Sequence, residues 1–107
     1  MRRANRNDTT QHEKFRKRVK SWSVRLRVKP AQVRIQRMTR KWASWSTTGR
    51  VTFATDLLRQ PELFQNYVIV HELLHFRIPN HGKLFKSMLG AHIPRWREVA
   101  TTPDLAR

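Results

Sequence analysis

The stretch from Tyr67 to Phe76 constrains the fold most, because an apolar helix pattern there contains three chemically active side chains. Valine, isoleucine and leucine fill five of its ten positions, and Tyr67 and Phe76 bound it, so a helix over this stretch must be buried between layers. The same stretch nevertheless includes His71, Glu72 and His75. Unpartnered imidazole and carboxylate groups are costly in a core, and a divalent cation removes that cost. The pattern therefore indicates a domain built around a metal-binding helix.

The spacing of these three residues indicates which chemistry the metal performs. An α-helix turns about 100° per residue, so His71 and His75 lie on one face and can bind the same ion. Glu72 lies beside them and can reach a water molecule on that ion. This is the His-Glu-x-x-His arrangement of zinc hydrolases. A single histidine on an apolar face would be better explained as a hydrogen-bonded core residue.

A catalytic zinc needs a third protein ligand and one open position, and His81 is the main candidate. A continuous helix would carry residue 81 about 9 Å beyond His75, too far to share an ion. Ile78-Pro79-Asn80 supplies a break, because proline disfavours helical geometry before it and Asn80 can cap a following helix. The alternatives for the third ligand are Glu98 and His92.

Length and composition predict one small domain, with residues 1–10 as a disordered basic arm, 11–100 as the folded unit and 101–107 as a tail. The chain has no cysteine, which excludes disulfides, thiol catalysis and cysteine-ligated zinc. Its basic N-terminus lacks an apolar segment, and no apolar run approaches a membrane span. We therefore expect a soluble, cytoplasmic protein.

The charge is strongly asymmetric. Residues 1–50 hold 16 Lys and Arg but 2 Asp and Glu, whereas residues 51–107 hold 7 and 5. A field of this size attracts polyanions, with nucleic acid the most abundant candidate; the alternative is a solvated basic face. The expected contact residues lie on the outer face of the first helix: Lys14, Lys17, Arg18 and Arg25.

That first helix is predicted over residues 11–27 by an apolar stripe at spacings of three and four. The stripe consists of Phe15, Val19, Trp22 and Leu26. Alternating residues over 33–38, a second extended segment over 41–46, and a strand over 50–54 after a Thr47-Thr48-Gly49 turn predict a small antiparallel sheet. We expect its last strand to be an exposed edge that could hold an extended peptide substrate.

The remaining chain is predicted to be helical, over residues 61–76, 81–91 and a short segment from Pro94. The last segment has Trp96, Val99 and Ala100 facing inward. The predicted fold class is thus α+β: a three-stranded antiparallel sheet packed on the buried metal helix, with an amphipathic N-terminal helix and further C-terminal helices.

With these residues placed, the chain resembles the YgjP-like zinc metallopeptidase domains over about residues 12–100, and more distantly the SprT-like and Wss-type DNA-associated proteases. The resemblance rests on Arg40 to Ser44, on Gly49-Arg50-Val51, on the 67–75 segment with its His-Glu-x-x-His motif, on Asn80-His81 with Phe85, and on Pro94 with Trp96. It implies a small α+β domain with one zinc ion held by His71, His75 and His81, and a catalytic Glu72.

Two departures from the family pattern are present. Trp42-Ala43-Ser44-Trp45 stands where the family usually has Trp-Gly-Ser-Cys, and Ala54 stands where it has an asparagine. We expect these positions to lie away from the metal ligands, so that zinc binding is unaffected. Substrate contacts or packing roles that the family assigns to them do not transfer to this chain.

The sequence thus supports three hypotheses. The first is a zinc-dependent peptidase in which Glu72 is the general base, recruited to nucleic acid by the basic half. Its oxyanion donor is open among Tyr67, Arg77 and His92. The second is a nucleic-acid-binding protein with a structural or vestigial zinc site. The third is an interaction module without metal.

Overall fold

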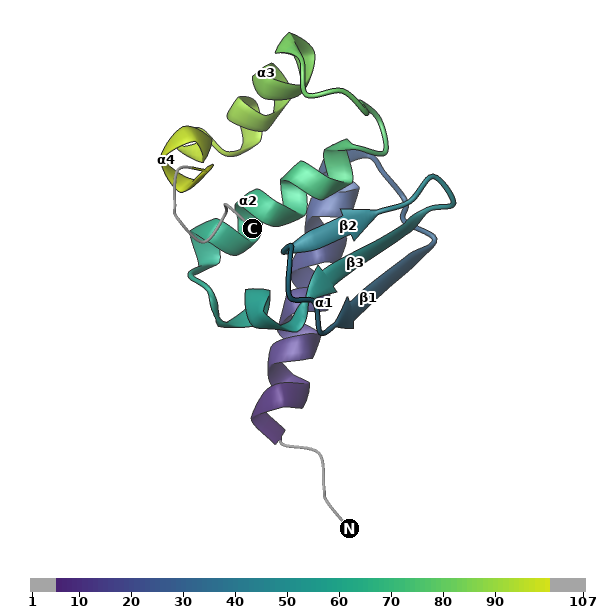
Figure 1. Cartoon of the computed structure of the whole chain (residues 1–107), viewed down its shortest axis with the longest axis vertical. Coiled ribbons are helices and arrows are strands. Elements are labelled where there is room, and N and C mark those ends of the chain that lie inside the picture. The colour runs from purple at the N-terminus through teal and green to yellow at the C-terminus, as the bar shows by residue number, and fades with distance from the viewer. Residues whose placement is uncertain (1–5, 101–107) are drawn as a thin grey trace.

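The structure, a computed structural model, describes residues 6–100 (Figure 1). Its elements follow the order α1 (Arg6–Leu26), β1 (Gln32–Gln36), β2 (Ala43–Trp45), β3 (Arg50–Ala54), the 3-10 helix η1 (Thr55–Arg59), α2 (Glu62–Leu74), α3 (Lys83–His92) and α4 (Trp96–Ala100). This is the expected small α+β fold. No helix within residues 6–100 has the length and apolarity that a membrane span requires.

The sheet has the strand order β1-β3-β2, and it is mixed rather than fully antiparallel. β2 and β3 form the predicted antiparallel hairpin, whose turn ends at Gly49 with a φ of 98° that suits glycine. β1, however, runs parallel to β3, with Val33 opposite Val51. The prediction of an entirely antiparallel sheet is therefore wrong for one of its two strand pairs.

The path from β1 to β2 explains the mixed sheet. Residues 37–42 cross the end of β3, where the backbone N–H of Ala54 donates a 2.8 Å hydrogen bond to the carbonyl of Trp42. β3 is thereby inserted between the other strands, and its residues 51–54 are all buried. The expectation that the last strand is an exposed edge is wrong. β1 and β2 are the edges, and β2 is the edge that packs on α2.

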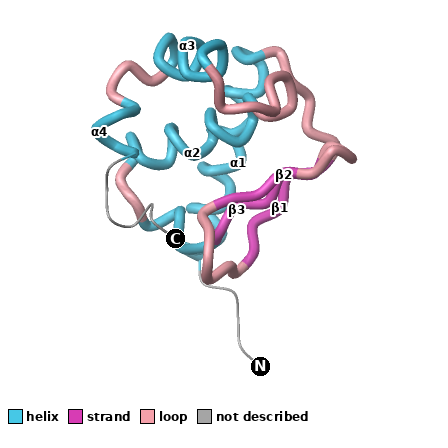
Figure 2. Tube along the Cα trace, turned by 45° about the horizontal axis from the view of Figure 1, so that its top comes forward, coloured by secondary structure: helices cyan, strands magenta, loops and turns pink. Residues whose placement is uncertain are grey.

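One face of the sheet is covered by helices, and Figure 2 shows the strands together at one side of the molecule with the helices gathered on the other. Val33 and Ile35 of β1 turn toward the core, while Gln32, Arg34 and Gln36 are exposed. In strands, successive side chains point to opposite faces, so this alternation indicates a half-buried edge strand.

Helix α1 carries its predicted stripe into the core, with Phe15 packed edge-on against Phe53 at 5.1 Å between ring centroids. It begins at Arg6, so residues 6–10, predicted to belong to a disordered arm, are helical. The rest of that arm and the predicted tail, residues 1–5 and 101–107, lie outside the described residues. At the other end, Arg27 adopts a φ of 59° and Val28 N–H bonds the carbonyl of Ser23 at 3.0 Å, which terminates the helix.

Helix α2 is the buried helix that its composition predicts. Ile69, Val70, Leu73 and Leu74 are fully buried, and burying each such side chain stabilises the fold by about 1.5–3 kcal/mol. Its surroundings are α1, β2, α3 and α4. The hydrophobic effect therefore fixes α2 as the centre of the domain.

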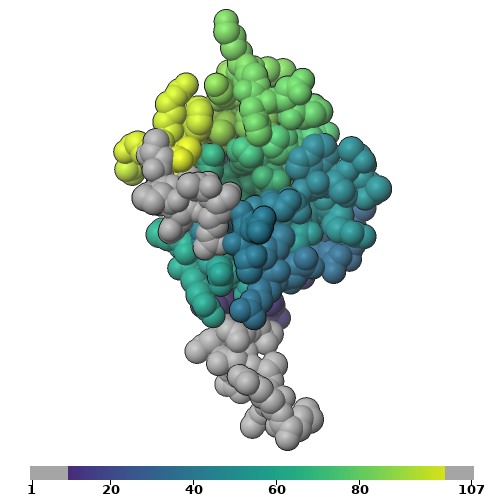
Figure 3. Space-filling view, viewed as in Figure 1, coloured from purple at the N-terminus to yellow at the C-terminus, as the bar shows by residue number. Residues whose placement is uncertain are grey.

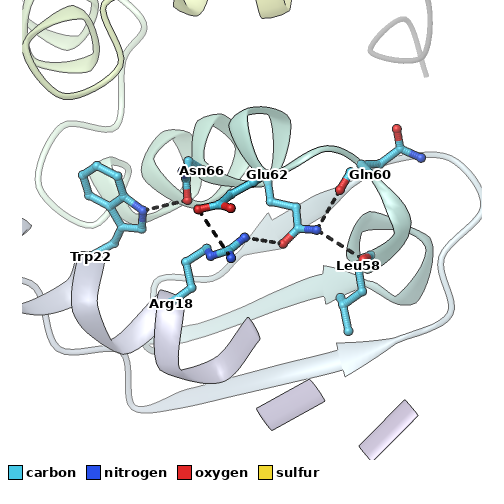
Figure 4. A network of polar contacts seen from close by, with 7 residues as sticks. Arg18, Trp22, Leu58, Gln60, Glu62 and Asn66 are labelled. Carbon is cyan, nitrogen blue, oxygen red and sulfur yellow. Dashed lines mark hydrogen bonds and ion pairs between the residues drawn. The ribbon is translucent and has the colours of Figure 1, made fainter. Parts of the chain in front are cut away.

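A polar network fastens α1 to α2 (Figure 4). The amide of Gln65, which is 9% exposed, donates to the carbonyls of Leu58 at 3.2 Å and Gln60 at 2.8 Å. Its oxygen accepts a 2.8 Å hydrogen bond from Arg18, whose guanidinium also lies 3.7 Å from Glu62. Gln65 thus joins α2 both to α1 and to residues 58–60.

Candidate metal centre

The end of α2 places two of the predicted ligands on one face. The helix ends at Leu74, but His75 keeps helical backbone angles, with φ −62° and ψ −21°. Its ring centroid therefore lies only 5.0 Å from that of His71, one turn earlier. The predicted pairing of the two histidines on one helical face is what the structure has.

The chain then turns back and brings in His81. Backbone hydrogen bonds from Arg77 and Ile78 to the carbonyl of Leu74, at 2.9 and 2.8 Å, close the last turn. The break before Pro79 is present, but α3 begins at Lys83 with Gly82 as its N-cap, so Asn80 does not cap it as expected. Because His81 precedes α3 in an exposed loop, its side chain can reach back to α2.

The three histidines converge on one point. The Nε2 atoms of His75 and His81 are 2.8 Å apart. One ring nitrogen from each of His71, His75 and His81 lies within 4.8 Å of the others. A tetrahedral ion with bonds of 2.0–2.1 Å requires nitrogens about 3.3 Å apart, so these three donors lie close enough together to bind one zinc ion after a small adjustment. A donor set made only of imidazoles also favours zinc over magnesium or calcium.

The side chain of Glu72 also lies beside the three histidines. Its side chain is 12% exposed, and its Oε2 lies 3.1 Å from the Nδ1 of His71. The carboxylate also acts electrostatically on Tyr67, His75 and His81. The Glu72 carboxylate therefore lies beside the three histidines.

Burial adjusts the acid–base properties of the cluster. It lowers the pKa of His75, a shift that the Glu72 carboxylate and the Pro79 backbone oppose. Burial also lowers the pKa of His81, while burial and the charge of Glu72 raise the pKa of Tyr67. At neutral pH the two imidazoles are neutral and available as ligands, and the Tyr67 hydroxyl keeps its proton.

Aromatic rings surround the histidines, and two of them were not predicted to be there. Phe85 of α3, predicted as a core residue, lies 5.2, 5.0 and 4.7 Å from the rings of His71, His75 and His81. Trp45 of β2 stacks on His75 at 5.5 Å. On the face shown in Figure 3, the green side chains that follow α2 lie directly against the blue side chains of the strand region.

The Trp45 contact corrects an expectation. The departures from the family pattern were expected to lie away from the ligands, which is wrong for Trp45. Ala43 and Ala54 are buried in the sheet. The only signal in the sequence was the position of Trp45 in an extended segment, which does not specify the neighbouring helix.

The alternative third ligands lie elsewhere. Glu98 is paired with Arg95 at 3.0 and 3.3 Å on the surface. His92 packs edge-on against Trp22 at 5.9 Å. Of the three candidate oxyanion donors, Arg77 donates to the carbonyl of Leu26, whereas Tyr67 packs 5.7 Å from His71. The structure therefore brings Tyr67 to the cluster, but neither Glu98 nor His92.

The predicted nucleic-acid residues form a separate surface. Lys14, Lys17, Arg18 and Arg25 line one open hollow of about 480 Å³ between α1 and α2, together with Trp22. Arg25 lies over the Trp22 ring at 4.2 Å, and Arg18 is held by Gln65. A larger hollow of about 760 Å³ lies along the flank of α1 that faces β1, and no cluster residue lines it. Size alone therefore does not identify the active site here.

A small α+β domain with a triple-histidine cluster at the end of its buried helix is the architecture of a metallopeptidase. The chain belongs to the YgjP-like metallopeptidase domain family, whose profile matches residues 4–102. No curated protein sequence matches it.

The solved structures that share the fold include two metallopeptidase zymogens. The metallopeptidase zymogen jannalysin of Methanocaldococcus jannaschii has a TM-score of 0.72 and 25% identity, over 79% of this chain and 88% of jannalysin. The zymogen abylysin of Pyrococcus abyssi has a TM-score of 0.70 and 22% identity, over 79% and 87% of the two chains. The protein is a zinc metallopeptidase with protein or peptide substrates.

Proposed function

We propose that His71, His75 and His81 hold the catalytic zinc and that Glu72 is the general base of peptide-bond hydrolysis. The observation that carries this proposal is the convergence of three ring nitrogens within 4.8 Å beside a carboxylate. Three protein ligands leave a tetrahedral ion one position for water or substrate, which is the pattern of catalytic rather than structural sites.

The steps assigned to the chain's own residues are proton transfers and positioning. Zinc, when bound, lowers the pKa of water to about 7 and polarises a carbonyl. Glu72 accepts the proton of the attacking water and donates it to the nitrogen of the leaving amine, so the carboxylate is regenerated. Tyr67 keeps its proton because its pKa is raised, and it can donate a hydrogen bond to the developing oxyanion.

The substrate is proposed to bind in extended form along β2. This strand is an edge of the sheet, and it packs on the helix that carries His71 and His75. An edge strand offers backbone groups that pair with any peptide, which gives binding that tolerates different side chains.

Substitution of Glu72 by Gln tests this mechanism. The isosteric amide keeps the shape of the side chain but cannot accept the proton, so we expect hydrolysis of a denatured protein substrate to fall by at least about 10²–10⁴-fold. Zinc content should stay at the wild-type level. The matched control is Glu98→Gln, because Glu98 pairs with Arg95 on the surface away from the histidines. This variant should remain active. Full activity of Glu72→Gln would instead remove Glu72 from the mechanism.

A second proposal is that the basic surface of α1 recruits the peptidase to nucleic acid. It is supported by the hollow that Lys14, Lys17, Arg18 and Arg25 line, because four cations beside one aromatic ring suit a phosphate backbone. Arg18 serves mainly to hold α1 on α2 through Gln65 and Glu62. Lys14 and Lys17 are therefore the residues to test.

Charge reversal at Lys14 and Lys17 should weaken binding of single-stranded DNA. It should also reduce the slope of the salt dependence by about one unit for each phosphate that the variant no longer binds. The control is reversal of the exposed Arg34 and Lys41, which changes the net charge equally. Equally weakened binding in both variants would indicate unspecific attraction to a +16 protein.

Proteolysis assays also test whether the peptidase is recruited to nucleic acid. Equal cleavage of a protein substrate with and without DNA would refute it. If the chain were instead a nucleic-acid-binding protein with a vestigial zinc site, Glu72→Gln would change neither its proteolysis nor its DNA binding.

A further inference from the structure

Trp45 lies against one of the three clustered histidines with its ring plane nearly parallel to the imidazole. Its indole and the imidazole of His75 are stacked with 8° between their planes and 5.5 Å between their centroids. Offset stacking at this separation is a favourable arrangement of two rings. Trp45 itself is fixed by pairing with Val51 in the sheet and by an edge contact with Phe76 at 5.7 Å.

In the described part of the chain, His75 lacks the well-aligned hydrogen bond that metal-binding histidines usually make with their second ring nitrogen. Its Nε2 faces His81, so Nδ1 is the nitrogen that points away from the cluster. Nδ1 is buried and makes no well-aligned hydrogen bond to any atom of residues 6–100. Burial lowers the pKa of His75, whereas the backbone of Pro79, the hydrogen-bonding group that acts on the ring, raises it. In most metal sites this second nitrogen donates to an oxygen, and that hydrogen bond sets the plane of the ring.

We propose that Trp45 is a positioning residue for His75, and that stacking on the indole sets the plane of the imidazole, which has no well-aligned hydrogen bond at Nδ1 within the described residues. The inference rests on the proposed function, because it takes His75 to be a zinc ligand. Phe85 has a different role: its ring lies near all three histidines and forms a common apolar floor. Trp45 contacts His75 from the sheet, and it therefore links the edge strand β2 to one metal ligand.

Zinc affinity is the direct measure of this role. Removing a group that orients a metal ligand typically costs 10- to 100-fold in metal affinity. Trp45→Leu, which keeps an apolar side chain but removes the stacking ring, should therefore weaken zinc binding at least about 10-fold in competition with a chromophoric chelator. Trp45→Phe keeps a ring and should stay within about 3-fold of wild type. Trp96→Leu removes a tryptophan that packs near Arg97 and should leave zinc affinity unchanged.

A double-mutant cycle with His75→Ala separates the positioning of His75 by Trp45 from an effect of Trp45 on general stability. If Trp45 acts through His75, Trp45→Leu has no further effect on the weak zinc binding of the His75→Ala variant. Melting temperatures in excess chelator show whether each variant folds without metal. Trp45→Met, whose flexible side chain adapts to gaps, is the second replacement if the leucine variant does not fold.

The outcomes are distinct. Tight zinc binding by the wild type, with unchanged affinity in Trp45→Leu and Trp45→Met, overturns the positioning role and leaves the proposed function intact. An equal decrease in the wild-type and His75→Ala backgrounds also overturns it, because Trp45 then acts through the fold. A wild-type protein that binds no zinc contradicts the proposed function itself.

Discussion

The Nε2 atoms of His75 and His81 lie 2.8 Å apart, although a helix end and a proline separate the two residues in sequence. Two neutral imidazoles approach so closely only if one donates a hydrogen to the other or if both bind a third atom. Since a zinc ion requires nitrogens about 3.3 Å apart, a small movement of the His81 loop would admit it. The proposed metal site therefore depends on His81 as much as on the helical pair.

Removal of zinc should destabilise the protein. An ion that binds only the folded state contributes about 2.7 kcal/mol when present at 100 times its dissociation constant. For a domain of this size, that corresponds to a melting temperature lower by roughly 10–20 °C after chelation. Differential scanning calorimetry with and without chelator measures the shift. An unchanged melting temperature would favour the interaction module without metal.

The metal-free protein should lose stability as the pH falls. Burial lowers the pKa values of His75 and His81 below the ordinary 6.5, so below that pH the unfolded chain binds protons that the folded chain does not. Stability is thus greatest and nearly constant above about pH 7 with respect to these groups, and it decreases from about pH 6.5 downward.

Melting curves in chelator between pH 8 and pH 5 test this direction. His75→Gln should flatten the dependence, because it removes the buried titrating group. A melting temperature that rises as the pH falls would show that protonated His75 is favoured in the folded state.

Tyr67→Phe should lower kcat while zinc content and the melting temperature stay close to wild type. The variant keeps the ring beside His71 but removes the hydroxyl proposed to stabilise the oxyanion. Loss of one such donor costs about 10²–10³-fold in kcat. Steady-state hydrolysis of a quenched fluorescent peptide measures kcat and KM. A rise in KM with unchanged kcat would assign Tyr67 to substrate binding instead.

Gln65→Leu should destabilise the fold by about 1–3 kcal/mol, because it leaves the carbonyls of Leu58 and Gln60 and part of Arg18 without partners. Urea denaturation measures the change in the free energy of unfolding. Glu62→Gln is the control, since the Glu62 side chain is 72% exposed and its contact with Arg18 is 3.7 Å long. Equal destabilisation by Glu62→Gln and Gln65→Leu would contradict the role of Gln65 at the centre of the network.

Local patterns predicted the elements well, and the reason is physical. The stripe through Phe15 and Leu26, the turn at Gly49 and the apolar stretch around Ile69 each depend on residues that are close in sequence. The pairing of His71 and His75 on one face follows from helix geometry. The position of His81 beside them follows from the break at Pro79, where the chain turns back toward α2.

Contacts between distant segments were not predictable in the same way. Alternation in β1 shows which face is buried but not which strand is its neighbour, so the parallel pair of Val33 with Val51 was missed. The stacking of Trp45 on His75 depends on how β2 packs against α2. The hydrophobic periodicity of the sequence does not specify this packing. The helical start of α1 at Arg6 extends a polar segment that has no apolar stripe of its own.

Zinc content of the purified protein tests the central claim most directly, measured by mass spectrometry for the wild type, His75→Ala, His81→Ala and His92→Ala. The three-histidine site predicts one zinc per chain in the wild type and in His92→Ala, and a large decrease in both His75→Ala and His81→Ala. A decrease in His75→Ala with full retention in His81→Ala would contradict that site and would place the third ligand elsewhere in the chain.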